Sequence, residues 1–85
     1  MSYKKTISVK GSNFFHKKAI SKASHKFKNA KNLDEKSKAR LSSSYHQQII
    51  VLQTNFGRVL SKSEREAVFE YYKDLESAYV KRFHK

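Results

Sequence analysis

Residues 41–60 of this 85-residue chain read LSSSYHQQIIVLQTNFGRVL, and large apolar side chains are dense there while charge almost disappears. The apolar residues follow one another at steps of three and four, at Leu41, Tyr45, Ile49, Leu52, Phe56 and Val59. This spacing predicts a helix that packs along its whole length. Because Ile50 and Val51 widen the stripe, we expect this helix to be central, with neighbours on more than one side. Because residues 49–52 are all apolar, we expect them to form the contact surface, or seam, of a homo-oligomer; the alternative is that they are buried in the core of a monomer.

A lysine-rich segment precedes the central helix. Residues 13–31 place apolar side chains on one helical face at Phe15, Ala19, Ala23, Phe27 and Ala30. Gly11 interrupts the weak alternation of residues 3–10, and Ser12 or Asn13 is then expected to cap the start of the helix. We therefore predict an extended N-terminal arm or short strand over residues 1–12 and a single helical domain over residues 13–85.

Helix boundaries in the second half are marked by capping residues. Asn32 followed by Glu35 resembles a capping box, and Gly57 suits a left-handed cap that ends the central helix. The patterns Ser61-x-x-Glu64 and Ser63-x-x-Glu66 both predict a new helix start near residue 61. The fold class is thus all-α, with three main helices at about 13–31, 34–56 and 62–84. The serine run at 42–44 leaves open whether residues 34–56 form one helix or two.

Charge gives the main functional signal. The chain has 19 Lys plus Arg against 7 Asp plus Glu, a net charge of +12, and residues 1–33 contain nine lysines and no acid. A polyanionic partner relieves the self-repulsion of such a surface. Lysine outnumbers arginine 15 to 4. Because base reading favours Arg, Asn and Gln, this composition predicts binding to phosphates of a nucleic acid, preferably RNA, with limited sequence preference.

The residues expected to carry this binding follow from the basic segment. Phosphate contacts are predicted at Lys4, Lys5, Lys10, Lys17, Lys18, Lys22, Lys26, Lys28, Lys31 and Arg40. Stacking on unpaired bases is expected from Tyr3, Phe14, His16 and His25, with core packing as the alternative for Phe14.

Two other binding classes remain open. In ribbon-helix-helix DNA-binding regulators a strand precedes two helices, and KTISVKGSNFF is similar to their opening strand. Thr6, Ser8 and Lys10 would then enter a major groove. Against this class, the first helix is too long and too basic, and the third has no counterpart. A cationic amphipathic protein on a membrane surface is the other alternative, although an apolar face made mostly of alanine would bury little area in lipid.

Catalytic signals are weak. His16, His25, His46 and His84 form no compact ligand set, and the chain has no Cys, so we expect no catalytic residue, no metal and no cofactor. The first residues lack the apolar core of a secretory signal, and no apolar run is long enough to cross a bilayer. A cytoplasmic protein is expected.

The chain as a whole, short, lysine-rich and without Cys, Trp or Pro, resembles the small basic early proteins of T-even bacteriophages. This resemblance implies a counter-defence protein that engages RNA and, directly or through RNA, a ribonuclease toxin of a toxin–antitoxin system. It rests on length and composition and not on a motif, so it assigns no role to any residue.

Overall fold

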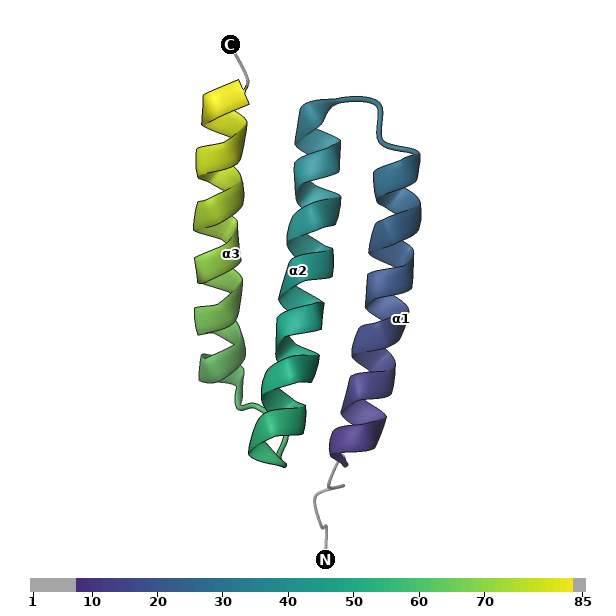
Figure 1. Ribbon diagram of the computed structural model, residues 1–85, viewed down its shortest axis with the longest axis vertical. Helices are drawn as coiled ribbons and strands as arrows, with labels where there is room; N and C mark the ends of the chain where they lie inside the picture. The colour runs from purple at the N-terminus through teal and green to yellow at the C-terminus, as the bar shows by residue number, and fades with distance from the viewer. Residues whose placement is uncertain (1–7, 84–85) are drawn as a thin grey trace, which may run out of the picture.

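The chain folds into three α-helices joined by short connections. The computed structural model describes residues 8–83, in which α1 spans Val9–Lys28, α2 spans Leu33–Phe56 and α3 spans Lys62–Phe83 (Figure 1). The all-α prediction with three main helices is confirmed. Residues 34–56 lie in one continuous helix, which settles the alternative left open by the serine run.

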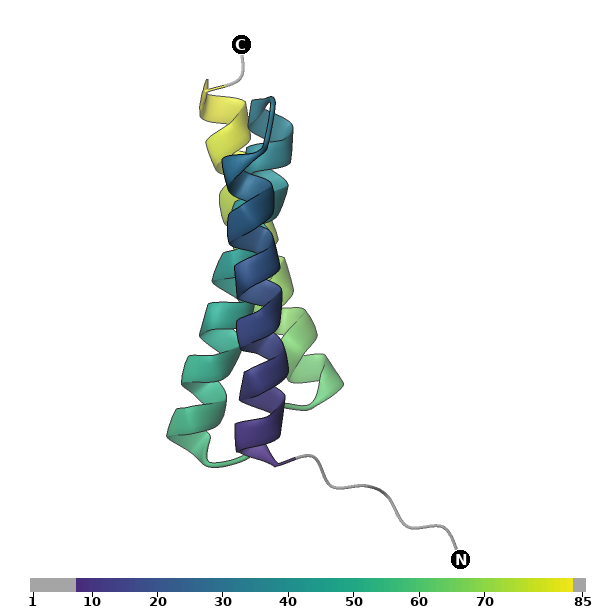
Figure 2. The same cartoon turned by 90° about the vertical axis from the view of Figure 1, so that its right-hand side faces the viewer.

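The helices form an open layer with α2 in the middle. α2 packs against α1 along one side and against α3 along the other, whereas α1 and α3 make no packing contact among residues 8–83 (Figure 1). Seen from the edge, α1 runs along α2, while the start of α3 diverges from the end of α2 (Figure 2). The central position predicted for residues 41–60 is therefore confirmed, and both edge helices have more than one side free.

The start of α1 differs from the prediction. The N-cap is Ser8, whose Oγ accepts a hydrogen bond from the Gly11 amide at 3.0 Å, so Gly11 lies inside the helix. The prediction of a cap at Ser12 or Asn13 is wrong because a serine three residues ahead of Gly11 satisfies the first free amides earlier. The predicted arm or strand is accordingly wrong for residues 9–12, which lie in α1, while Ser8 is extended and residues 1–7 lie outside the described part.

The other caps follow the sequence. Asn32 accepts a hydrogen bond from the Glu35 amide at 2.9 Å, and Gly57 ends α2 in the left-handed conformation with φ 71°. Before α3, Ser61 and Glu64 exchange the two reciprocal bonds of a capping box. Hydrogen bonds from Arg58 and then from the Ser61 amide lower the pKa of Glu64 to about 2. These three predictions of helix boundaries are confirmed.

The core is small. Among residues 8–83 the buried apolar side chains are Ala23, Ala39, Ile49 and Leu60, and α3 contributes no buried residue. Ala23 and Ala39 allow close approach of α1 to α2, as alanines on a contact face do. The buried face of α1 is rotated from the predicted one, because it includes Ser12 while Phe15 is 65% exposed.

A buried glutamine replaces apolar packing where the three segments meet. Gln53 is fully buried, and its Nε2 donates to Ser12 Oγ at 3.1 Å and to Asn13 Oδ1 at 2.9 Å. Its Oε1 accepts from the Leu60 amide at 3.0 Å. One side chain of α2 thus holds the start of α1 and the connection to α3, which explains why a polar residue faces inward here.

Candidate nucleic-acid interface

The basic residues are concentrated on an edge helix. α1 contains six lysines and no acidic residue, whereas α3 carries five basic and five acidic residues. The six lysines are all exposed, at Lys10, Lys17, Lys18, Lys22, Lys26 and Lys28. Successive residues of an α-helix are rotated by about 100°, so these six lysines are distributed around the part of the α1 surface that does not pack against α2. A polyanion can therefore reach them without displacing any packing contact.

An aromatic ring lies on the outermost line of α1. Phe14 is 56% exposed, and Lys18 Nζ lies 4.9 Å from the centre of its ring. His25 is exposed on the same side, two turns beyond Lys18, and Asn29 Nδ2 lies 3.2 Å from its Nε2. An exposed ring beside a flexible cation offers a base a stacking surface next to a charge for its phosphate. Phe14 therefore does not pack in the core, and the alternative given for it is wrong.

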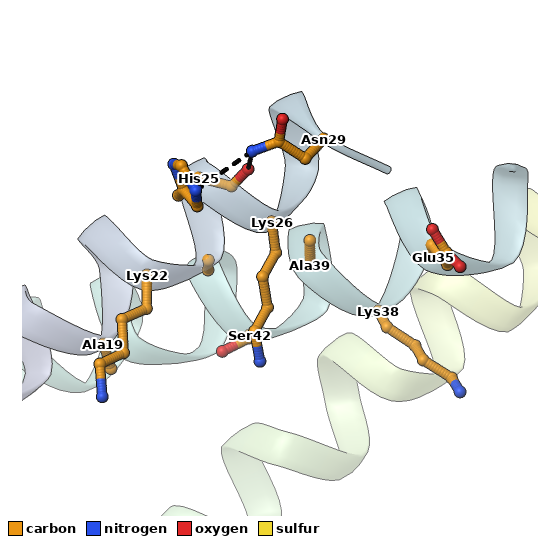
Figure 3. Close-up of a pocket in the computed structure, with 10 residues that line it drawn as sticks. Ala19, Lys22, His25, Lys26, Asn29, Glu35, Lys38, Ala39 and Ser42 are labelled. Carbon is orange, nitrogen blue, oxygen red and sulfur yellow. Dashed lines mark hydrogen bonds between the residues drawn. The ribbon is translucent and has the colours of Figure 1, made fainter. Parts of the chain in front are cut away.

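A groove with lysines at its rim runs between α1 and α2. Its floor is the contact of Ala23 with Ala39, and it is also lined by Ala19 and Ser42. In Figure 3 the side chains of Lys22 and Lys26 from α1 and of Lys38 from α2 extend toward the same side of the molecule. Glu35 is the carboxylate at this groove, and its Oε1 accepts from the Lys31 amide. The groove thus places three ammonium groups around a shallow, partly apolar floor.

Arg40 lies in a different environment from the lysines. Its Nε donates to both carboxylate oxygens of Glu76, at 3.1 and 3.0 Å, and its guanidinium stacks 4.2 Å from the ring centre of Tyr79. Hydrogen bonding to Glu76 raises the pKa of Arg40. Because its charge is already paired with Glu76, Arg40 links α2 to α3, and of the α1 lysines it shares a cavity with Lys28, on the side opposite Lys22 and Lys26.

His16 also has an internal partner. Its Nδ1 lies 2.7 Å from Nδ1 of His46 on α2, so one neutral ring donates and the other accepts. Burial lowers the pKa of both imidazoles, and the charge of Arg65 lowers that of His16 further. The predicted stacking role of His16 therefore competes with a contact between helices.

The structure brings together only part of the predicted set. Lys31 is exposed in the connection between α1 and α2, next to the groove, while Tyr3, Lys4 and Lys5 lie outside the described residues. Sequence reasoning missed Lys38. The sequence does contain information about its position. The connection between α1 and α2 is four residues long, so the two helices form an antiparallel hairpin. Residues of such a hairpin lie opposite each other when their numbers sum to about 62, as His16 and His46 do, and this places Lys38 near Lys22 and Lys26.

Comparison of the chain with protein-family models, with curated proteins and with solved structures finds no match. Within residues 8–83 no helix has the length and apolar character needed to cross a membrane. The same residues contain no group of three or more side chains of His, Cys, Asp or Glu arranged to hold a metal ion.

Proposed function

We propose that this protein binds RNA through α1, mainly by contacts to phosphates, and without catalysis. The observation that carries the proposal is that an edge helix packed only against α2 among residues 8–83 presents six exposed lysines, no acid and the exposed ring of Phe14. Lysines around the helix suit a flexible single strand, because each is a mobile point charge and the ring accepts any base.

The groove between α1 and α2 extends this surface toward the middle of the layer. Lys22 and Lys26 are one turn apart on α1, and Lys38 faces them from α2. A strand that follows the groove would meet ammonium groups from both helices, and the small side chains of the floor leave room for the backbone. Sequence-specific base recognition is not expected, since no arginine lies at this groove.

The biological role is proposed from the resemblance to small early phage proteins alone. On that basis the RNA-bound protein would engage a ribonuclease toxin, directly or through shared RNA, and act as a counter-defence factor. A pull-down of such a toxin with and without nuclease treatment separates the two routes.

The salt dependence of RNA affinity tests the proposal. If about six phosphates are neutralised on a single strand, log K should fall with log salt at a slope near −4. The measurement is fluorescence anisotropy with a labelled 20-nucleotide RNA, repeated with duplex DNA and with anionic liposomes. A flat salt response, or binding to liposomes without binding to RNA, would contradict the proposal.

A pair of charge-matched triple variants locates the site. Lys18→Glu with Lys22→Glu and Lys26→Glu should weaken RNA binding at least 100-fold, because three phosphate contacts become repulsive. The control carries the same charge change on exposed lysines of α2 and α3, Lys36→Glu with Lys73→Glu and Lys81→Glu, and should lose much less. Equal losses would show that net charge matters and α1 does not. Circular dichroism verifies that both variants keep their helices.

A further inference from the structure

The layer has two faces that differ in chemistry. Buried Ala23 and Ala39 separate them: Lys22, Lys26 and Lys38 line the groove on one side, and Phe27, Lys28 and Arg40 line the other. Because Arg40 lies against the rings of both Phe27 and Tyr79, at 6.0 and 4.2 Å, all three helices contribute to this second side.

Helical periodicity extends the second side along α2 and α3. Val51 follows Arg40 by eleven residues, which is three turns, and Leu75 precedes Tyr79 by one turn. We call this surface the open apolar face, and its large apolar members, with their exposed fractions, are Phe27 (39%), Val51 (49%), Tyr71 (61%), Leu75 (49%) and Tyr79 (38%).

We propose that the open apolar face is the contact between two copies of this chain, which pack face to face across a two-fold axis. The exposed area has the size that such a contact needs. Since a Phe or Tyr side chain offers about 150–250 Å², the exposed fractions of the five residues amount to roughly 400–500 Å². A standard interface takes about 800 Å² from each partner, of which about 56–65% is apolar. The five residues match that apolar share.

Charge also favours a second copy. The centre of the face holds one cation, Arg40, and the 3.0 Å ion pair with Glu76 neutralises it. The unpaired lysines Lys22, Lys26 and Lys38 lie at the groove on the opposite side. Beside Phe27 and Arg40 the lining residues include one lysine, Lys28, whereas three lysines line the groove side. Two chains of net charge +12 therefore oppose fewer lysines when they meet through the open apolar face than when they meet through the groove side.

The weak core of the single chain supplies the remaining argument. α3 presents Tyr71, Leu75 and Tyr79 to solvent and has no buried residue, which is unusual for a stable 22-residue helix. A two-fold contact buries the same patch on both chains and gives α3 a second packing surface. Within the seam predicted at residues 49–52, Ile49 is fully buried inside the single chain and Val51 is available for the partner.

Sedimentation equilibrium of nuclease-treated protein tests the proposal. The full-length chain should have twice its 10.0 kDa mass at micromolar concentration. Leu75→Glu and Val51→Glu should each raise the dimer dissociation constant at least 100-fold, because a two-fold axis buries the new carboxylate twice. Phe14→Glu, on the outer side of α1, is the control and should leave the mass unchanged. A 10 kDa mass for the unmodified chain at 100 µM would overturn the proposal, as would dissociation by Phe14→Glu equal to that by Leu75→Glu.

Cross-linking covers the case in which the glutamate variants fail to fold. The chain has no Cys, so Leu75→Cys or Val51→Cys introduces a single thiol. A short bifunctional maleimide should join two chains through either thiol at dilute concentration and should not join Phe14→Cys. Equal cross-linking of Phe14→Cys would overturn the proposed face.

Discussion

Replacing Gln53 by leucine should destabilise the protein strongly, although the two side chains are similar in size. The change leaves the Leu60 amide, which is buried and donates to Gln53 Oε1 at 3.0 Å, without an acceptor. It also leaves Ser12 Oγ without its partner at 3.1 Å, while Asn13 can turn to water.

The magnitude follows from these groups. An unsatisfied buried donor or acceptor costs about 1–3 kcal/mol, and the better burial of leucine offsets a part, so the expected loss is about 2–4 kcal/mol. For a domain of this size each kcal/mol lowers Tm by about 4–8 °C. Urea denaturation followed by circular dichroism measures the free energy of unfolding, at one fixed protein concentration so that any contribution from self-association is comparable between the variants.

A matched variant makes the result interpretable. Gln47 lies on the same helix but is exposed, and its Nε2 donates to the nearby Ser43 Oγ, so Gln47→Leu should change the free energy of unfolding by less than about 0.5 kcal/mol. If Gln53→Leu costs less than about 1 kcal/mol, or no more than Gln47→Leu, the hydrogen bonds of Gln53 do not stabilise the junction and the reasoning is refuted.

Two further predictions concern pH and a helix end. Because the pKa values of His16 and His46 are lowered in the folded state, the unfolded chain binds more protons just below pH 6.5, so stability should be full above that pH and fall as pH drops below it. His46→Asn should flatten this dependence in thermal melts at pH 5–8, and an unchanged slope would count against the histidine pair. Gly57→Ala should cost about 1 kcal/mol in urea unfolding, because φ is 71° and the site is otherwise open, while Gly57→Asn should cost less; equal stability of both variants with the natural chain would contradict the strain argument.

Sequence patterns predicted the helices better than they predicted the surfaces. Caps at Asn32, Gly57 and Ser61 depend on local chemistry, so the boundaries of α2 and the start of α3 could be predicted. The start of α1 could not be predicted in this way, because Ser8 and Ser12 are equally suitable N-cap residues and the choice between them depends on packing. Ser12 bonds to Gln53, forty-one residues away, and no local pattern contains that information.

Composition alone predicted the lysines of the candidate site on α1, whereas their arrangement relative to α2 depends on how the two helices are aligned. The lysines of α1 were identified because no acid interrupts them, but their relation to Lys38 required the pairing of α1 with α2. Arg40 and His16 have the residue types of a binding site yet hold helices together, which depends on Glu76 and His46 from other elements. Side chains that look alike in sequence are separated only by their long-range partners.

The linear order of contacts in this layer has a consequence for how the protein can change. α1 touches only α2, and α3 touches only α2, within residues 8–83. Phe27 of α1 and Tyr79 of α3 share Arg40 as a partner, but substitutions on the outer side of α1, at Phe14 or Lys18, lie away from it. Their effects on stability should therefore add to those of substitutions on α3, as they do for separated sites in general. The proposed RNA-binding side of α1 and the α3 part of the proposed contact between two copies can thus change separately in sequence, with α2 as the constant element between them.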